Sequence, residues 1–346
     1  MTEWFVWPFR SSTYSEMLIV VAGESLIDLI VEPLGRLHAS PGGGPFNAAR
    51  TIARLGHATR FLGRFSTDPF GQVLRDQLSH DGVGAALPDP VAAPTALAVV
   101  SVGALGVPQY WFHLAGTAAF ALDPQEAERA LDADVAALHI GTLGLVVEPM
   151  ATVLELLISS LPRSVLLLLD PNCRPAATAD ADGYRARVRR ILSRTDIVKT
   201  STEDLAFLLP GRGVSEAART LLDWGAGCVL VTDGPALIRA FAADDQLAVP
   251  VPPVEVVDTV GAGDAFGGAF LTWWVEHGLA REMLADHDLL RAAVTAAARV
   301  ASLTCGKAGA EPPWRHELEA SDGWAQLPVE RGYSGTGLSG GTPGQG

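Results

Sequence analysis

Short apolar runs alternate with amphipathic segments along most of the chain. Residues 18–22 form an apolar run that ends at Gly23, and residues 165–170 form another apolar run of strand length. Residues 150–161 instead repeat their apolar positions as an amphipathic helix does, and residues 292–304 form an alanine-rich helical segment. Apolar strands that alternate with helices are typical of a parallel sheet that is buried on both faces. The pattern therefore predicts an α/β fold with a doubly wound, mostly parallel sheet flanked by helices.

One stretch late in the chain concentrates the residues from which an anion site can be built. A β-branched run over residues 254–257 is followed by two glycines with an alanine between them and then by an acid: Gly261, Ala262, Gly263 and Asp264. The small residues let a ligand approach the backbone N–H groups, which favour an anion at the start of a helix. Asp264 adds a carboxylate that can accept a proton from a bound hydroxyl. An anion site beside a base is what phosphoryl transfer to an alcohol requires.

Each part of this stretch also has a purely structural interpretation, because an Asp often caps a helix and a glycine pair often makes a tight turn. The whole string from Asp258 to Phe266, however, resembles the signature D-T-x-G-A-G-D-x-F of the ribokinase-like (PfkB) carbohydrate kinases, and later motifs resemble their fructokinase-like branch. The resemblance implies transfer of the ATP γ-phosphoryl group to a sugar hydroxymethyl group. It makes Asp264 the base, and it assigns the stabilisation of the moving phosphoryl group to the N–H groups of residues 261–263.

The sugar-binding residues that the resemblance implies lie among the first fifty positions. Gly42, Gly43 and Asn47 match the family's first signature, G-G-x-x-x-N, although a glycine-rich loop alone predicts only a flexible turn. The resemblance gives the amide of Asn47 a contact with the sugar hydroxyls. Asp28 falls where the family has an Asp that binds these hydroxyls, and its position alone is equally typical of a surface residue.

The resemblance adds a small β-sheet lid, built from about residues 31–40 and 91–115, that closes over the sugar and excludes water. Relatives that act on acidic sugars or on fructose often carry an Arg where this chain has Leu114. An apolar residue offers no partner for a charged sugar, so we expect a neutral one. His113 is a candidate replacement contact, and a buried neutral histidine is the alternative interpretation. We also expect a homodimer formed through the lid.

The nucleotide-binding residues that the resemblance implies follow later strands. Residues 170–174, Asp-Pro-Asn-Cys-Arg, resemble the motif D-P-N-x-R, and residues 231–234 resemble V-T-x-G. The region that begins near Cys305 corresponds to the family's adenine slot, although small residues there also suit close helix packing. The implied contacts are Asn172, Arg174, Lys199, Ser201, Thr232, Gly234 and Gly306.

The family's N-x-x-E motif, which helps to place magnesium and the phosphates, is altered in this chain. Aligned on Lys199, its two positions are Ser201 and Asp204, and a shifted alignment puts Glu203 in the acidic role. Ser201 could equally be a helix N-cap. Asp258 lies where the family often has a monovalent-cation site. We therefore expect ATP and Mg²⁺ as cofactors and K⁺ as an activator, with candidate metal ligands Asp204, Glu203 and Asp258.

Composition and charge exclude several other classes. The formal charge of −14 argues against a nucleic-acid partner, which would require a basic face. No apolar run reaches the roughly 18 residues of a membrane span. Hydrophobic residues make up 48% of the chain and charged residues 18%, which is enough for a large buried core. Three widely spaced cysteines without a C-x-x-C pair suggest free thiols and a cytoplasmic protein.

The chain of 346 residues is long enough for one large α/β domain with a small appendage. We expect the kinase domain to cover residues 17–320. Residues 1–16 carry acids where a signal peptide has a basic flank, so we interpret them as an extension before the first strand. We expect residues 321–346, which become rich in glycine, serine and threonine, to form a flexible tail.

Three other classes remain as alternatives. A P-loop kinase needs G-x-x-x-x-G-K-[ST], which the sequence lacks. A dinucleotide oxidoreductase would need an acid about 20 residues beyond its glycines at the tip of the next strand, whereas Glu276 falls inside a predicted helix. A non-catalytic sugar-binding protein would be expected to lose Asp264. A fructose-like sugar is the favoured substrate, and ribose, ketodeoxygluconate and adenosine remain open.

Overall fold

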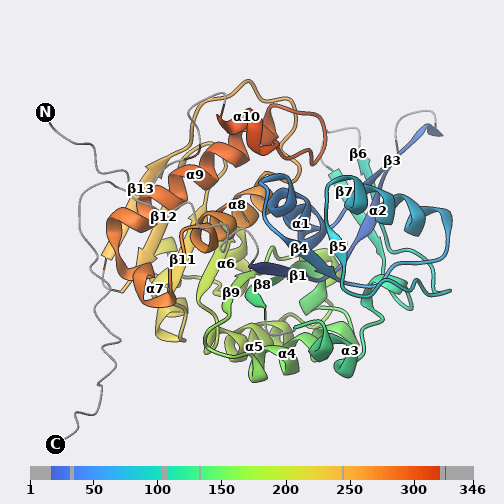
Figure 1. The fold of residues 1–346 in the computed structure, drawn as a ribbon, viewed down its shortest axis with the longest axis horizontal. Coiled ribbons are helices and arrows are strands. Elements are labelled where there is room, and N and C mark those ends of the chain that lie inside the picture. The colour runs from blue at the N-terminus through green and yellow to red at the C-terminus, as the bar shows by residue number, and fades with distance from the viewer. Residues whose placement is uncertain are drawn as a thin grey trace, which may run out of the picture.

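The structure is a computed structural model that describes residues 17–31, 35–102, 108–131, 134–243, 245–319 and 324. The extension expected over residues 1–16 lies outside these residues, as does the tail expected over residues 321–346 apart from residue 324. The described chain forms a large central sheet, helices on both of its faces, and a smaller sheet beside it (Figure 1).

The central sheet contains nine strands in the described part of the chain, in the order β13-β12-β11-β10-β9-β8-β1-β4-β5. Neighbours from β11 to β5 are parallel, and β12 and β13 add an antiparallel edge. This arrangement confirms the predicted α/β fold with a mostly parallel sheet. The strands are β1 (Leu18–Ala22), β4 (Thr59–Leu62), β5 (Gly84–Ala85), β8 (Val135–Gly141), β9 (Leu166–Asp170), β10 (Ile197–Ser201), β11 (Cys228–Thr232), β12 (Leu237–Ala242) and β13 (Asp245–Pro250).

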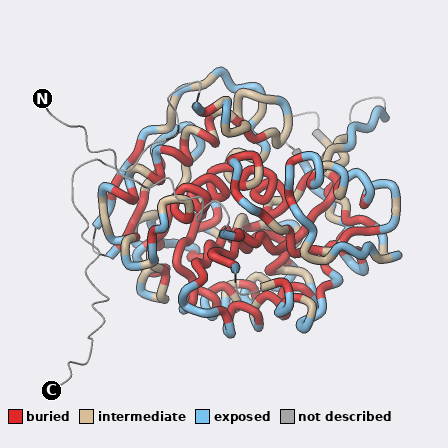
Figure 2. The backbone as a smooth tube through the Cα atoms, viewed as in Figure 1, coloured by how far each residue is buried: buried red, intermediate tan, exposed pale blue. Residues whose placement is uncertain are grey.

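Two helical layers cover the sheet, because alternate side chains of each strand point to opposite faces. In β1, Ile19 and Val21 pack with one layer and Val20 packs with the other. Figure 2 shows the buried backbone concentrated between these layers. The first layer comprises α1 (Gly44–Arg54), α2 (Pro69–His80), α8 (Ala262–Glu276) and α9 (His287–Cys305), and the second α3 (Pro124–Arg129), α4 (Met150–Ser160), α5 (Ala181–Leu192), α6 (Thr202–Leu208) and α7 (Val214–Asp223). A short helix, α10 (Arg315–Glu319), follows near the end of the described chain.

Helix boundaries differ from the predicted ones where capping residues extend a helix beyond its apolar pattern. The helix predicted over residues 292–304 begins at His287, because the side chain of Asp286 accepts the N–H groups of Asp288 and Leu289. In α1, which begins at Gly44, Pro45 lies in the first turn, where proline is well tolerated. Within the described residues, none of the helices combines the length and the apolar character that crossing a membrane requires.

The small sheet is the predicted lid, and its strands are ordered β3-β2-β6-β7. Its first part is longer than the expected 31–40, because β2 already begins at Leu26, soon after β1 ends at Ala22, and β3 runs to Gly42. Asp28 therefore lies on a lid strand, paired with Ser40 on one side and Ala98 on the other. The lid strands are β2 (Leu26–Val31), β3 (Leu37–Gly42), β6 (Leu97–Val102) and β7 (Pro108–His113).

Candidate active site

Helix α8 begins with the turn that the sequence predicted as an anion site. Gly261 is its N-cap residue, with φ of +78°, a left-handed conformation that glycine adopts without strain. A Cβ atom at this position would also lie 2.6 Å from the Cβ of Ala310. The N–H of Ala262 donates to the carbonyl oxygen of Thr259 at 3.3 Å, but the glycine N-cap provides no side-chain acceptor for the first turn of α8, which favours an anion there.

The apolar body of α8 fixes this turn against the core. Four aromatic side chains on the helix, Phe266, Phe270, Trp273 and Trp274, are almost completely buried. The rings of Phe270 and Trp274 stack with their centroids 5.6 Å apart. Buried aromatic groups contribute much of the packing free energy of a core. Asp264 is thus carried by a helix that has little freedom to move.

Asp264 is buried on the first turn of α8 and is contacted from two other elements. Asn47 Nδ2 donates to its Oδ2 at 2.9 Å, and Asn172 Nδ2 lies 3.4 Å from its Oδ1. Burial raises the pKa of Asp264, while the positive charge of Lys199, the Asn47 hydrogen bond and the charge of Arg174 oppose this rise. The carboxylate is therefore a stronger base than an exposed Asp and is still supported in its ionised form.

Lys199, predicted as a nucleotide contact, is buried behind this turn. Its Nζ forms an ion pair with Asp170 Oδ2 at 2.9 Å, and a Cβ atom on Gly263 would lie 2.8 Å from the same Nζ. Burial disfavours the charged amine, but the negative charges of Asp170, Asp264 and Asp204 raise the pKa of Lys199. These charges favour the protonated amine, which lies directly behind the first turn of α8.

Asn172 and Arg174, predicted as nucleotide contacts, follow β9 and lie close to Asp264. Asn172 has a φ of +37°, which turns its side chain toward Asp264 and toward Thr142 Oγ1, 3.5 Å away. Its Oδ1 accepts a hydrogen bond from Arg174 Nη1 at 2.7 Å. The strand end thus places an amide and a guanidinium beside the base. Thr142, also with a positive φ, was missed by the sequence analysis.

The glycine loop before α1 passes close to the base. Gly43 has a φ of +110°, and a Cβ atom there would lie 2.8 Å from the carbonyl oxygen of Glu24. Gly44 was not singled out from the sequence, but a Cβ atom on it would approach Thr142 Oγ1 to 2.6 Å and Asp264 Oδ1 to 3.2 Å. The sequence does contain a signal for Gly44, because three consecutive glycines stand where the G-G-x-x-x-N motif requires only two.

Two acids lie on the lid side of the loop. Asp28 is partly exposed, and burial together with the negative charge of Asp264 raises its pKa to about 6, against the charge of Arg174. A Cβ atom on Gly42 would overlap Asp28 Oδ2, so these two residues touch. Glu24 is fully buried, its Oε2 accepts the N–H of Gly144 at 2.9 Å, and burial raises its pKa to about 8. Glu24 was also missed, although an acid directly after a buried strand is a recognisable signal.

The pairing of the lid strands separates His113 from Asp28. Asp28 pairs with Ala98, which pairs with Phe112, so Phe112 shares the lid face of Asp28. His113 is the next residue along β7, is exposed, and points to the other face. Leu114, aligned with the family's Arg, is buried in the core.

The altered N-x-x-E motif forms a helix cap at the start of α6. Ser201 Oγ accepts the N–H of Asp204 at 3.0 Å, and Asp204 Oδ2 accepts the N–H of Ser201 at 2.9 Å. The other carboxylate oxygen of Asp204 accepts the N–H of Cys173 at 2.7 Å. The N-cap interpretation of Ser201 is thus confirmed. Glu203 is exposed, and in the described part of the chain no three His, Cys, Asp or Glu residues form a metal cluster.

Asp258 joins the α8 turn to the loop that follows α9. Its Oδ1 accepts the N–H of Val260 at 3.0 Å and its Oδ2 accepts the N–H of Gly309 at 2.9 Å. Gly306 lies in the same loop, where a Cβ atom would be 3.3 Å from a methyl group of Val254. The predicted adenine region and the signature are therefore hydrogen-bonded to each other.

Thr232 and Gly234 lie at the end of β11. The hydroxyl of Thr232 donates to the carbonyl oxygen of Thr200 at 3.3 Å, and Gly234 is exposed with φ of +52°. No direct contact joins this turn to Asp264 among the hydrogen bonds of the described residues. The two residues line up with the other strand ends, where ligand-binding residues collect in parallel sheets.

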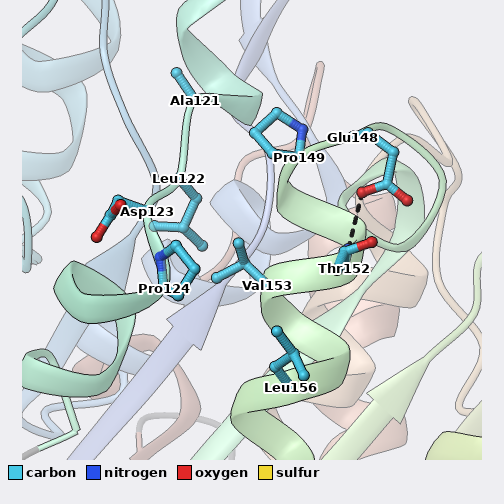
Figure 3. Close-up of a pocket in the computed structure, with 9 residues that line it drawn as sticks. All are labelled: Ala121, Leu122, Asp123, Pro124, Glu148, Pro149, Thr152, Val153 and Leu156. Atoms are coloured by element: carbon cyan, nitrogen blue, oxygen red, sulfur yellow. Dashed lines mark hydrogen bonds between the residues drawn. The ribbon is translucent and has the colours of Figure 1, made fainter.

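A separate surface pocket of about 730 Å³ lies between the segment before α3 and the start of α4 (Figure 3). None of the predicted site residues lines it. Its walls are mostly apolar, and Glu148 at its rim accepts the N–H of Thr152. The lining residues are Ala121, Leu122, Asp123, Pro124, Glu148, Pro149, Thr152, Val153 and Leu156.

Comparison with known proteins identifies the family of this chain. A family model described as pfkB family carbohydrate kinase matches residues 16–317. Fructokinase-1 of Oryza sativa subsp. japonica is 33% identical over 314 residues, which cover 87% of this chain and 96% of that protein.

Two crystal structures resemble the fold over nearly their whole length. Fructokinase with bound ATP from Xylella fastidiosa has a TM-score of 0.78 at 26% identity and covers 88% of this chain and 98% of its own. Fructokinase from Vibrio cholerae O395 in its fructose, ADP and calcium ion bound form has a TM-score of 0.76 at 25% identity, with 88% and 99% covered. The family predicted from the signature is confirmed: this chain belongs to the pfkB family and is a carbohydrate kinase.

Proposed function

We propose that this kinase transfers the γ-phosphoryl group of ATP to a hydroxymethyl group of a neutral, fructose-like sugar. The proposal rests on the surroundings of Asp264, a buried base at the N-terminus of α8. The amide of Asn47 on α1 lies on one side of its carboxylate, and the amide of Asn172 after β9 lies on the other. The names of the similar proteins support it, since one is a fructokinase with bound ATP and another has bound fructose and ADP.

The sugar would bind between the lid and the glycine loop. Asp28, with a pKa of about 6, is mostly ionised at neutral pH and can accept hydrogen bonds from two hydroxyls. Asn47 offers its Oδ1 while its Nδ2 is held by Asp264. Gly43 allows the ring to approach the backbone. Phe112, on the same lid face as Asp28, replaces His113 as the lid residue that we expect near the sugar.

Transfer would proceed in line. The hydroxymethyl oxygen forms a bond to the γ-phosphorus, the bond from that phosphorus to the ADP oxygen breaks, and the hydroxyl proton passes to Asp264. The raised pKa of Asp264 favours acceptance of this proton. The N–H groups of residues 261–263 stabilise the charge on the moving group, and Lys199 reinforces them from behind.

Magnesium would neutralise phosphate charge when it is bound with ATP. The carboxylates present fit an ion that keeps water and phosphate ligands, because the described residues near this end of the sheet offer separate acids and no cluster of three ligands. Both oxygens of Asp204 already accept backbone N–H groups, which favours the exposed Glu203 as the water-mediated contact.

We also propose activation by potassium near Asp258, the predicted cation position. The carboxylate of this residue accepts hydrogen bonds from the N–H groups of Val260 and Gly309, which lie in two different loops. Turnover compared in potassium and tetramethylammonium buffers at equal ionic strength tests it. Equal rates in the two buffers would remove the cation from the proposal.

The lid supports the proposal of a homodimer. Leu37 and Trp111 share the face of the lid opposite to Asp28, and they are 63% and 49% exposed. Exposed apolar groups on one face favour association. Sedimentation of the wild type and of Trp111→Lys tests it, with loss of the dimer expected in the variant. The free thiols of Cys173, Cys228 and Cys305 support a reducing compartment, for which we propose the cytoplasm.

The deciding experiment is ADP release with ATP and a panel of fructose, ribose, ketodeoxygluconate and adenosine. The proposal expects the highest kcat/KM for fructose. A clear preference for another member would reassign the substrate and keep the chemistry. Binding of a sugar without turnover under any ionic condition would instead favour a non-catalytic sugar-binding protein.

A further inference from the structure

Helix α1 carries a second feature at the end opposite to Asn47. Arg50 and Arg54 lie one helical turn apart and are both buried. Both donate to Asp81, the C-cap residue of α2: Arg50 Nε lies 2.5 Å from its Oδ2 and Arg54 Nε lies 2.9 Å from its Oδ1. Buried guanidinium groups need acceptors for their remaining N–H groups.

Those acceptors belong to the loop over residues 309–312, more than 250 positions later in the chain. Arg50 Nη1 donates to the carbonyl oxygen of Ala310 at 2.7 Å, and Arg54 Nη1 donates to that of Pro312 at 2.8 Å. Between these carbonyls, Glu311 accepts from Arg50 Nη2 at 2.8 Å and from Arg54 Nη1 at 2.5 Å. With Asp81, the group contains two cations and two anions, so its formal charge is balanced.

The other side of this loop contacts the turn at Gly261, where α8 begins. Ala310 packs so closely against Gly261 that a Cβ atom on the glycine would lie 2.6 Å from the Cβ of Ala310. The N–H of Gly309 donates to Asp258 Oδ2 at 2.9 Å. The loop is therefore held between the two arginines of α1 and the residues that begin the signature.

We propose that Arg50 and Arg54 are positioning residues that hold the 309–312 loop against the turn at Gly261. Helix α1 would then fix both Asn47, at its first turn, and the placement of the N–H groups at the start of α8. The inference rests on the proposed function, because it assigns the turn a role in phosphoryl transfer. Displacement of such donors by a fraction of an ångström lowers the rate without removing any group that touches the substrate.

Glu311 is the residue through which this role can be tested without leaving a buried charge unpaired. Its side chain is 42% exposed, and Asp81 would still pair with both arginines in Glu311→Gln. Glu155 provides a matched control, because it also accepts from two arginines, Arg187 and Arg190, on the other layer of helices. Glu155→Gln makes the same chemical change at a distant ion-pair group.

The experiment compares the two variants in steady-state kinetics, in ADP affinity and in amide hydrogen exchange over residues 305–311. For Glu311→Gln we expect kcat/KM for ATP to fall about tenfold, faster exchange in this loop, and a sugar KM within about twofold of the wild type. Glu155→Gln should leave kcat/KM for ATP, the exchange rates in this loop and the sugar KM unchanged.

A lower melting temperature of Glu311→Gln with unchanged kinetics and exchange would overturn the proposal and leave the cluster as a packing feature. An equal loss in Glu155→Gln would also overturn it, because the effect would then be general. If the wild type transfers no phosphoryl group to any sugar, the proposed function fails instead, while ADP affinity and exchange still decide whether the arginines position the loop.

Discussion

Asn47 on α1 donates to Asp264 on α8 at 2.9 Å and so joins two signatures that lie 217 positions apart. The Oδ1 of Asn47 is buried and has no hydrogen-bond partner within the part of the chain that the structure describes. Buried polar atoms almost always have a partner. The orientation of this amide therefore leaves one acceptor for a ligand hydroxyl, next to the carboxylate that would take its proton.

Replacement of the base provides the first prediction. Asp264→Asn keeps the shape and the hydrogen-bonding size of the side chain but cannot accept the hydroxyl proton. We expect kcat to fall about 10³-fold, with sugar and ATP affinities near those of the wild type by calorimetry. Turnover close to normal would contradict the mechanism, whereas loss of sugar affinity would make Asp264 a binding residue.

The side-chain amide of Asn47 on α1 provides the second prediction. Asn47→Ala removes a sugar contact and a hydrogen bond to the base, so we expect the sugar KM to rise about tenfold and the ATP KM to rise less. The pKa of Asp264 should rise further, because the Asn47 hydrogen bond opposes its elevation. Initial rates with each substrate varied separately measure the two KM values. A larger change in the ATP KM would reassign the glycine loop to the nucleotide.

The third prediction concerns Gly44. An alanine methyl would meet Thr142 Oγ1 at 2.6 Å and approach Asp264 Oδ1 to 3.2 Å, so Gly44→Ala must displace a group at the reaction centre. We expect kcat to fall about tenfold or more. Gly213→Ala is the control, because a Cβ atom there meets nothing within 4 Å. Equal activity of the two variants would show that the loop tolerates the methyl group.

Buried Glu24 provides a prediction for stability. Its pKa is about 8 in the folded protein, against an ordinary value of 4.5, chiefly because of burial. Between pH 4.5 and 8 the folded state holds a proton that the unfolded state has released, so the stability contributed by this group falls as pH rises. The free energy of unfolding should decrease by up to about 1.4 kcal/mol per pH unit in this range.

Glu24→Gln tests this directly, since it keeps an acceptor for the N–H of Gly144 and cannot ionise. Denaturant unfolding at pH 6, 7 and 8 should show a shallower decline for the variant than for the wild type. Glu155→Gln should retain the wild-type decline, because arginines hold the pKa of Glu155 below its ordinary value. Parallel curves for wild type and Glu24→Gln would contradict the assignment.

Much of the fold and of the reaction centre could be predicted from local sequence. The apolar run of β9 indicates a strand buried on both faces, and the signature around Asp264 indicates the family, while the role of Asp264 as the base stays a prediction. These features depend on residues that are neighbours in the chain, so a single sequence contains them.

Other features depend on which distant segments the fold brings together. The side chain of Lys199 points behind the turn because β10 pairs with β9 and presents it to Asp170, which the motif alone does not indicate. The register of the lid strands likewise places His113 on the face opposite to Asp28, which its position in the sequence does not indicate. The contacts of Arg50 and Arg54 likewise require the placement of a loop 260 positions away.

The lid has a consequence for the order of folding. Its two hairpins are joined by the pairing of Ile27 with Leu97, and α1, β4 and α2 lie between these residues in the chain. Contacts of such sequence separation form late, because the intervening chain must first lose its conformational freedom. The lid strand that carries Asp28 is therefore completed only when β6 has paired with β2. A chain in which β6 has not yet paired with β2 would lack the complete lid and, with it, the sheet that supports Asp28.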